Sequence, residues 1–364
     1  MTKVKISNIT INLDNKRKPL NGEDRSKISI EKKYPYCGAN NIMDYVDEYL
    51  FDEEIICIAE DGGKWGADET CSYIMNEKCW INNHAHVLKV LDTNCTDIRY
   101  LKYWLNHKDL NGVITGAIVK KLTQKALNDI EIDIPSIEEQ RNISNKLDTI
   151  SNLIEYKKNQ ILKLNELIKS QFVEMFGDPL VNDGMFEMKL IKQIGKVVSG
   201  ATPKTNNDEF WNGNNIWVTP AELNDNSFVI SDSERKITDL GVKSCAVNLL
   251  PKNTVILSSR APIGKTAIAG VDMYCNQGFK NIIPSNEINS IYLYELLKNK
   301  TEYLNSLGRG ATFKEISKEI VENIKIKVPP IVLQNKFAQI VEQIDKQKFV
   351  NLKIFQLLGK KLKK

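Results

Sequence analysis

Two long segments of the chain place apolar residues at alternating spacings of four and three. In the first segment these positions are Ile143, Leu147, Ile150, Ile154, Ile161, Leu164 and Ile168, with Lys157 as the polar interruption. In the second they are Phe337, Val341, Ile344, Phe355, Leu358 and Leu362, with Lys348 and Asn351 as the polar interruptions. This alternation is the heptad pattern of helices that pack on one another. We therefore predict two long helices with matching seams.

The two helices have a common register. Lys157 and Asn351 stand 194 residues apart at the same seam position, where a polar residue fixes register at some cost in stability. Each helix of about 38 residues would be ~57 Å long at 1.5 Å per residue. That length exceeds the needs of a compact domain and suggests a spacer.

The segment that enters each helix is also repeated. Residues 116–140 and 310–334 agree at eight of 25 positions, in a fixed offset of 194. The identical pairs are Gly116 and Gly310, Ala117 and Ala311, Lys120 and Lys314, Ile130 and Ile324, Ile132 and Ile326, Pro135 and Pro329, Ile137 and Ile331, and Gln140 and Gln334. Solenoid repeats are only about 20 to 50 residues long, so this period indicates two copies of a whole domain.

Ahead of each predicted helix the pattern changes to short β-rich runs between turn residues. EIICIAE, HVLKVL and IEIDIP are such runs in the first copy, and ILSSRAP, KTAIAG and NIKIKVP in the second. Short helices are predicted at 100–107 and 292–299. The predicted fold class is α+β, a pseudo-twofold repeat of two β-rich domains with short helices. The predicted boundaries are 1–133 and 177–327 for these domains, and 134–176 and 328–364 for the helices.

The amino-acid composition limits the classes of protein to which the chain can belong. A chain of 364 residues with 42% hydrophobic residues can bury more than one core. No apolar run approaches the roughly 18 residues of a membrane span, and the first residues lack a signal peptide, so we expect a cytoplasmic protein without membrane contact. The net charge of +4 allows a polyanionic partner without requiring one.

The seven cysteines do not suggest a disulfide scaffold or a strong metal site. Their odd number suits a reducing compartment. A zinc site is conceivable, but no CxxC pair is present and the second copy has no matching histidines. Its ligands would come from Cys71, Cys79, His84, His86 and Cys95. We therefore predict no metal site.

Motifs for catalysis are weak. SRAPIGKT at 259–266 resembles the end of a phosphate-binding loop, but Ser259 stands where that pattern requires glycine. The acids of AEDGGKWG at 59–66 lack a matched carboxylate and have no equivalent in the second copy. Only three histidines occur, all before residue 108. We therefore expect no catalytic residues and no cofactor bound by this chain.

Polar and aromatic loops favour contact with nucleic acid. Asparagine can pair with adenine, lysine and arginine with guanine, and a threonine methyl with thymine. The predicted DNA-binding residues of the first copy are Lys16, Arg17, Lys18, Arg25, Lys33, Tyr36, Asn40, Asn41 and Lys64. Those of the second copy are Thr202, Lys204, Thr205, Asn206, Trp217, Thr219, Arg260, Lys265, Lys280 and Arg309.

Several motifs together resemble the DNA-specificity subunit of type I restriction-modification enzymes. They are SGATPKTNNDEFWNGNNIWVTPAEL at 199–223, SSRAPIGKTAI with CNQGF at 275–279, GATFKEISKEIVENIKIKVPPIVLQNKFAQIVEQID from 310, and FVEMFGDP at 172–179. The resemblance implies two target-recognition domains that each read half of a bipartite DNA sequence. It also implies two long antiparallel helices that set the unread gap and dock two methyltransferase subunits.

The same resemblance implies that chemistry belongs to partner subunits. S-adenosylmethionine would then be bound by the methyltransferases, and ATP and magnesium by restriction and translocation subunits. A ~57 Å spacer would limit the separation of the half-sites to about 16 base pairs. Two alternatives remain: a stand-alone nuclease or DNA-modifying enzyme using Glu60, Asp61 and Lys64, and a structural adaptor that binds no DNA.

Overall fold

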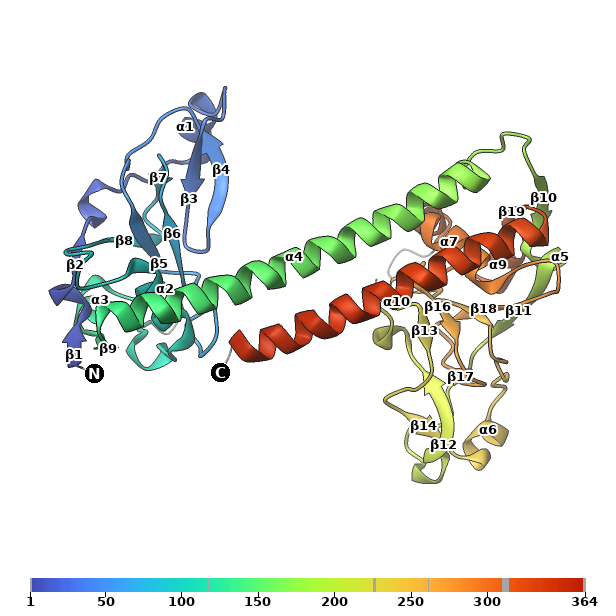
Figure 1. The fold of residues 1–364 in the computed structure, drawn as a ribbon. Helices are drawn as coiled ribbons and strands as arrows, with labels where there is room; N and C mark the ends of the chain where they lie inside the picture. Colours follow the sequence, from blue (N-terminus) through green and yellow to red (C-terminus); the bar gives the residue numbers. More distant parts are fainter. Residues whose placement is uncertain (1, 117, 225–226, 261, 310–313, 363–364) are drawn as a thin grey trace. The chain divides into compact units, whose positions relative to one another are not determined.

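The computed structural model describes residues 2–116, 118–224, 227–260, 262–309 and 314–362 (Figure 1). The chain forms two compact units, Met1–Lys157 with Lys353–Lys364, and Lys158–Leu352. Two long helices, α4 (Ile137–Phe176) and α10 (Ile331–Leu362), contribute residues to both units. We call residues 2–134 the first head and residues 187–328 the second head, and describe each unit by itself.

The first head is built from two sheets and a short ribbon. A four-stranded antiparallel sheet has the order β2-β8-β5-β6, a three-stranded sheet has the order β4-β3-β7, and β1 pairs with β9. The strands are β1 (Thr2–Lys5), β2 (Thr10–Asn12), β3 (Tyr34–Cys37), β4 (Ile42–Val46), β5 (Ile55–Ala59), β6 (Ser72–Met75), β7 (Trp80–Ile81), β8 (Ala85–Val90) and β9 (Glu131–Ile134). The helices are α1 (Gly22–Lys27), α2 (Ile98–His107) and α3 (Gln124–Asp129). All five residues of β5 are buried, as its continuous apolar run predicts.

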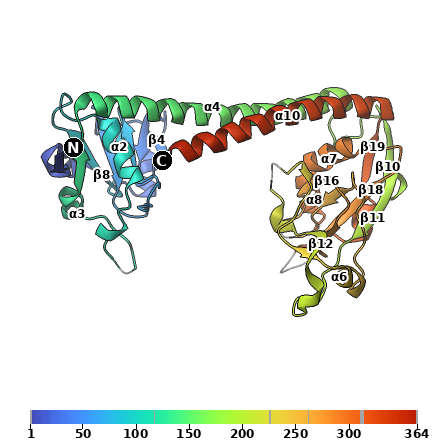
Figure 2. The ribbon, with the colours of Figure 1, turned by 60° about the horizontal axis from the view of Figure 1, so that its bottom comes forward.

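The second head has a five-stranded sheet of order β11-β18-β15-β16-β13, a three-stranded sheet of order β14-β12-β17, and the ribbon β10-β19 (Figure 2). Its strands are β10 (Glu187–Leu190), β11 (Gly195–Ser199), β12 (Trp211–Val218), β13 (Val229–Ile230), β14 (Lys236–Ile237), β15 (Val255–Leu257), β16 (Thr266–Ala269), β17 (Tyr274–Cys275), β18 (Lys280–Pro284) and β19 (Lys325–Val328). Its helices are α5 (Ile191–Ile194), α6 (Asp239–Ser244), α7 (Ser290–Asn299), α8 (Thr301–Ser306) and α9 (Lys318–Glu322).

The two heads share one topology. The order β2-β8-β5-β6 corresponds to β11-β18-β15-β16, and β4-β3-β7 corresponds to β14-β12-β17. In both three-stranded sheets the central strand pairs antiparallel with one neighbour and parallel with the other. Strand β13 and helix α8 have no counterpart among the described elements of the first head. The predicted α+β class and its internal repeat are confirmed.

The repeated entry motif has a physical role in each copy. The buried Gln140 side chain donates to the carbonyls of Pro135 and Cys95 and accepts from the amide of Asp97. Gln334 makes the equivalent bonds to Pro329, Glu287 and Asn289. Each glutamine thus ties the start of a long helix to its head. Five residues of the motif, Ala117, Gly310, Ala311, Thr312 and Phe313, lie outside the described residues.

The predicted seams lie on the less exposed sides of α4 and α10. Leu362 lies outside the residues whose side chains the structure describes; every other predicted seam residue is buried or half-buried, including the polar Lys157 and Asn351. In the second unit, Phe172 and Phe176 near the end of α4 contact Phe337 near the start of α10, with ring centroids 5.5 and 5.4 Å apart. Tyr292 of α7 stacks on Phe172 at 5.6 Å. The two helices therefore run antiparallel within this unit.

Among the described residues, no helix combines the length and the apolar character that a membrane crossing needs.

Candidate nucleic-acid interface

In the second head, tryptophans fix the loop that carries four of the predicted DNA-binding residues. The indole N–H of Trp217 donates to the carbonyl of Ala201 at 3.0 Å, and that of Trp211 donates to the carbonyl of Lys204 at 3.1 Å. The amide of Ala201 donates to the carbonyl of Cys275 at 3.0 Å. Loop 200–207 is thus held against the sheet β14-β12-β17, while Lys204, Thr205 and Asn206 are exposed.

The first head contains a similar device, in which the tryptophan comes from β7 rather than from the central strand. The indole N–H of Trp80 donates to the carbonyl of Lys18 at 2.7 Å, and the amide of Lys18 donates to the carbonyl of Ile81. Ile81 and Cys275 occupy equivalent positions in the parallel pairs of the two three-stranded sheets. The loop around Lys18-Pro19 therefore corresponds structurally to the loop around Thr202-Pro203.

The predicted DNA-binding residues divide by exposure. Ten of them are exposed: Lys16, Lys18, Lys33, Asn40, Asn41, Lys64, Lys204, Thr205, Asn206 and Arg309. Six are half-buried: Arg17, Arg25, Thr202, Thr219, Arg260 and Lys265. Tyr36, Trp217 and Lys280 are buried. Exposed side chains are available for contact with DNA, and for these ten residues DNA contact remains a prediction.

Five of the predicted residues instead serve the interior of a head. Tyr36 and Trp217 are each 2% exposed and belong to small aromatic cores. The Lys280 ammonium lies 3.2 Å from Glu315, and the Lys265 ammonium donates to the Leu223 carbonyl at 2.6 Å. Arg17 is bound to Glu60, as described below. For these residues we replace the predicted DNA contact with a packing or ion-pairing role, because their polar atoms already have partners inside the fold.

One basic residue that sequence reasoning missed lies on the aromatic core of the second head. The Arg235 guanidinium carbon is 3.7 Å from the ring centroid of Trp211 and 5.5 Å from that of Trp217. The two indoles meet edge to face with centroids 5.0 Å apart. In the first head, Arg25 takes a similar place over Tyr36 at 5.3 Å and pairs with Asp44. Each three-stranded sheet thus has a cation on its aromatic core.

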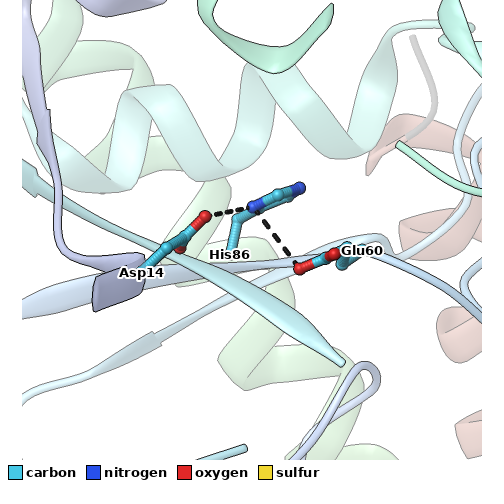
Figure 3. Close-up of side chains that lie close together, drawn as sticks. All are labelled: Asp14, Glu60 and His86. Atoms are coloured by element: carbon cyan, nitrogen blue, oxygen red, sulfur yellow. Dashed lines mark hydrogen bonds and ion pairs between the residues drawn. The ribbon is translucent and has the colours of Figure 1, made fainter. Parts of the chain in front are cut away.

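A buried polar cluster joins four segments of the first head (Figure 3). His86 Nδ1 is 2.6 Å from Asp14 Oδ2 and 3.7 Å from Glu60 Oε2, and its Nε2 is 2.8 Å from the Leu122 carbonyl. Arg17 pairs with Glu60 at 2.6 Å, and Lys121 pairs with its other oxygen at 2.7 Å. Two carboxylates are therefore balanced by neighbouring cations and hydrogen-bond donors.

The ionised state of both carboxyl groups is favoured. Burial raises the pKa of Glu60, but hydrogen bonds from Lys121 and Arg17 outweigh it and leave the pKa below its usual value. Burial likewise raises the pKa of Asp14, and hydrogen bonds from His86 and the Val87 amide lower it further than burial raises it. The cluster is an internal ion network that holds Lys121 and Leu122 against the head.

Asp14, Glu60 and His86 are also the one group of possible metal ligands whose atoms lie within 4.8 Å of one another in the described chain. A ligating histidine must direct a nitrogen lone pair at the metal. Both nitrogens of His86 instead face oxygen acceptors. The donor set therefore fits a proton-bearing network better than a metal centre.

The residues weighed for other chemistries do not converge. The zinc candidates are dispersed: His84 binds Asp61, Cys95 binds Asp92, and Cys71 binds the Leu105 carbonyl. The nuclease candidates Glu60 and Asp61 are both paired, to Arg17 and His84, and Lys64 is exposed.

The loop that resembles a phosphate-binding loop is closed on itself. The amide of Gly264 donates to the Ser258 carbonyl at 3.0 Å, and the amide of Lys265 donates to the Ser258 hydroxyl at 2.9 Å. A phosphate-binding loop must present such amides to its ligand. This loop is therefore a structural turn.

Comparisons with known proteins agree with this architecture. The model of the type I restriction modification DNA specificity domain matches residues 2–166 and again 184–355. The MjaIX specificity subunit of Methanocaldococcus jannaschii is 42% identical over 163 residues, which are 44% of this chain and 38% of that relative. A putative type I specificity subunit of Haemophilus influenzae is 23% identical over 348 residues, 92% of this chain and 84% of that relative.

A solved structure shows the same fold. The S subunit of a type I restriction-modification system from M. genitalium matches with a TM-score of 0.69 at 17% identity, over 99% of this chain and 94% of that one. Since the family model covers nearly the whole chain in two copies, the chain belongs to the family of type I restriction modification DNA specificity domains.

Proposed function

We propose that this chain is the sequence-recognition subunit of a type I restriction-modification system, in which each head reads one half of a bipartite DNA target. The observation that carries this is the repetition of one topology with different exposed side chains in the two copies. A common frame with different surfaces suits two short DNA words of different sequence. Exposed lysines beside the loops would hold phosphates, and loop side chains would read base edges.

The long helices α4 and α10 would set the unread gap between the two words. Apolar side chains remain exposed along them, including Leu162, Leu167 and Val332. Such residues suit docking to other subunits. We propose that they bind two methyltransferase subunits, which restriction and translocation subunits join.

In this assembly the chain contributes recognition and no catalysis. The carboxylates weighed for catalysis are engaged in internal ion pairs, which supports this division. S-adenosylmethionine, ATP and magnesium would then be bound by the partner subunits. An adenine in each half-site would be flipped from the duplex into a methyltransferase pocket.

Mapping modified adenines in cells tests the proposal. The chain is expressed with the methyltransferase of its system, and adenine modification is sequenced across the genome in its presence and absence. We expect one bipartite sequence with a fixed gap, modified only when the chain is present. Modification that is independent of the chain would contradict recognition. Cleavage or methylation of DNA with Mg²⁺ by the purified chain alone would contradict its non-catalytic role.

A further inference from the structure

Strand β12 of the second head is interrupted by a bulge. Ile237 of β14 pairs with both Trp211 and Asn215, so residues 212–214 are looped out of the sheet. The tripeptide is Asn-Gly-Asn. A Cβ on Gly213 would lie 2.5 Å from the Ile237 carbonyl oxygen, which only glycine avoids. The bulge is therefore a specific feature of the sheet, and we call residues 212–214 the second bulge.

The first head has a loop at the equivalent place, in the connection from α1 to β3. The amide of Asp47 donates to the Ile28 carbonyl, and Tyr34 pairs with Val46, so residues 29–33 are looped out. In the second head the corresponding amide of Thr238 donates to the Phe210 carbonyl. The Asp47 carboxylate accepts the amides of Ile30 and Glu31 at 2.9 Å each. We call residues 29–33 the first bulge.

The two bulges share a frame and differ in chemistry. The second bulge lies within β12 beside the buried Ile237, and the first leads from α1 into β3 beside the buried Val46. Each contains a non-glycine residue with positive φ, Lys32 at 54° and Asn212 at 60°. The first ends in Glu-Lys-Lys and the second is Asn-Gly-Asn. The two heads thus share a looped segment with a positive-φ residue at this place, but the side chains that it carries differ.

The second bulge presents unengaged amides on a rigid base. Asn212 and Asn214 are exposed, and their side chains make no hydrogen bond to any residue that the structure describes. Beneath them, Trp211 and Trp217 pack edge to face under Arg235 and anchor loop 200–207. Bulges re-aim side chains, and positive φ in a non-glycine residue is typical of functional sites. The amides are therefore preorganised for a ligand outside the head.

We propose that the two bulges are equivalent base-reading elements, one for each half of the DNA target. This inference rests on the proposed function and specifies the residues that determine specificity. An asparagine amide offers a donor and an acceptor that match N7 and N6 of adenine in the major groove. Asn212 and Asn214 thus select an A·T pair in the second head's word.

The first bulge selects a different pair. Lys33 and Glu31 form an exposed ion pair, and Lys32 is exposed beside them. A lysine ammonium donates to O6 and N7 of guanine, and a glutamate carboxylate accepts from N4 of cytosine. The first bulge therefore reads a G·C pair. The different side chains of the two bulges would therefore select different base pairs in the two halves of the DNA target.

The test uses the full chain with its methyltransferase in cells. The variant N212G with N214A removes both amides, and glycine keeps the positive φ of position 212. Adenine modification is sequenced for this variant, for the unaltered chain, and for the control N286A. Asn286 is an exposed asparagine outside the three-stranded sheet, with no hydrogen bond from its side chain to the described residues.

We expect the double variant to lose its preference for one A·T position of the second head's word by about tenfold to a hundredfold. The other word, the gap and the N286A pattern should stay unchanged. An unchanged second word in the double variant would overturn the proposal while leaving the proposed function intact. If the unaltered chain itself directed no bipartite modification, the proposed function would fail instead. A thermal-unfolding scan of each purified variant confirms that the head remains folded.

Discussion

The two heads form ion pairs of opposite polarity at an equivalent position. In the first head, Lys121 pairs with Glu60, close to the buried His86. In the second, Glu315 is in the place of Lys121 and pairs with Lys280, which replaces His86 in the corresponding strand. Backbone bonds are retained as well, because Leu122 binds the Glu60 carbonyl and Ile316 binds the Ser259 carbonyl.

The comparison of the two heads distinguishes contacts that can be made by different residues from contacts that are made by the same residue in both copies. In both heads this position forms a charge-balanced contact with the neighbouring strand, and either side can supply the cation. The buried glutamines Gln140 and Gln334, in contrast, are identical and make the same bonds. An amide that donates to two carbonyls and accepts one N–H has no simple replacement. Identity is thus expected where one side chain satisfies several backbone groups.

The two copies should differ most in how much the residue at the start of each long helix contributes to the free energy of unfolding. Phe337 is fully buried against Phe172 and Phe176, whereas its equivalent Ile143 is half-buried in the first head. We expect F337A to destabilise the second unit by about 3–5 kcal/mol and I143A to destabilise the first by about 1–2 kcal/mol. Region-resolved hydrogen exchange in urea would measure both.

The conservative variant F337L provides the control for this comparison. It retains most of the buried apolar volume and should cost less than F337A. Equal losses for F337A and I143A would show that the two helix entries are energetically equivalent, against the packing described above.

The helices and the duplication were predictable from sequence because their signals are local. A heptad spacing and a 25-residue match can be read without knowing any partner strand. The bulges could not be found in that way. Their existence depends on the pairing of Ile237 with two residues of β12, more than 20 positions earlier. The Asn-Gly step of the second bulge is a turn signal, but it does not indicate a loop within a strand.

The sequence also could not show which charged residues are paired inside a head and which are exposed. Lys204 and Lys265 both lie in polar loops and have the same chemistry. Only the tertiary structure shows that Lys265 reaches the Leu223 carbonyl while Lys204 is exposed. Arg235 was missed for the reverse reason, because the tryptophans it covers are 24 and 18 positions earlier in the chain.

Exchanging the bulges would sharpen the comparison of the two heads. Replacing Glu31-Lys32-Lys33 by Asn-Gly-Asn should convert a G·C preference in the first head's word into an A·T preference. The expected change in discrimination is about 1–3 kcal/mol, the range for a bidentate base contact. Modified-adenine sequencing would measure it, with K3N as a lysine-to-asparagine control on strand β1. A change in the second head's word would contradict independent reading by the two heads.

Lowering the pH should change the contribution of buried carboxyl groups to folding stability in opposite directions in the two units. Asp14 and Glu60 have lowered pKa values, so their stabilising contribution is present above the usual carboxyl pKa of about 4 and is lost as pH falls through the lower folded values. In the second unit, burial raises the pKa of Glu295 and of Asp345. Those groups favour folding most below the usual pKa, and this contribution is lost as pH rises through the raised values.

As pH falls from 7 toward the usual carboxyl pKa of about 4, we therefore expect protonation of Glu295 and Asp345 to stabilise the second unit, while Asp14 and Glu60 of the first stay ionised. Below about pH 4 the first unit should lose stability. Hydrogen exchange corrected for intrinsic rates would follow each unit. E295Q, which removes the titrating group, should raise stability at pH 7 and reduce the gain at pH 5. An acid-induced loss in the second unit above pH 5 would contradict this assignment.

The smallest expected effect tests the division between exposed and internal cations. K204A should weaken binding to a duplex with the mapped site by less than about 1 kcal/mol, and it should reduce the slope of log K against log salt by about 0.9, the value for one lost phosphate contact. K265A should leave that slope unchanged and instead destabilise the second head by about 1–2 kcal/mol, because the Leu223 carbonyl loses a charged donor. If K265A lowered the slope as K204A does, the Lys265 ammonium would have to leave that carbonyl for a phosphate when DNA binds, and the exposure of a lysine in the free protein would no longer identify the DNA face.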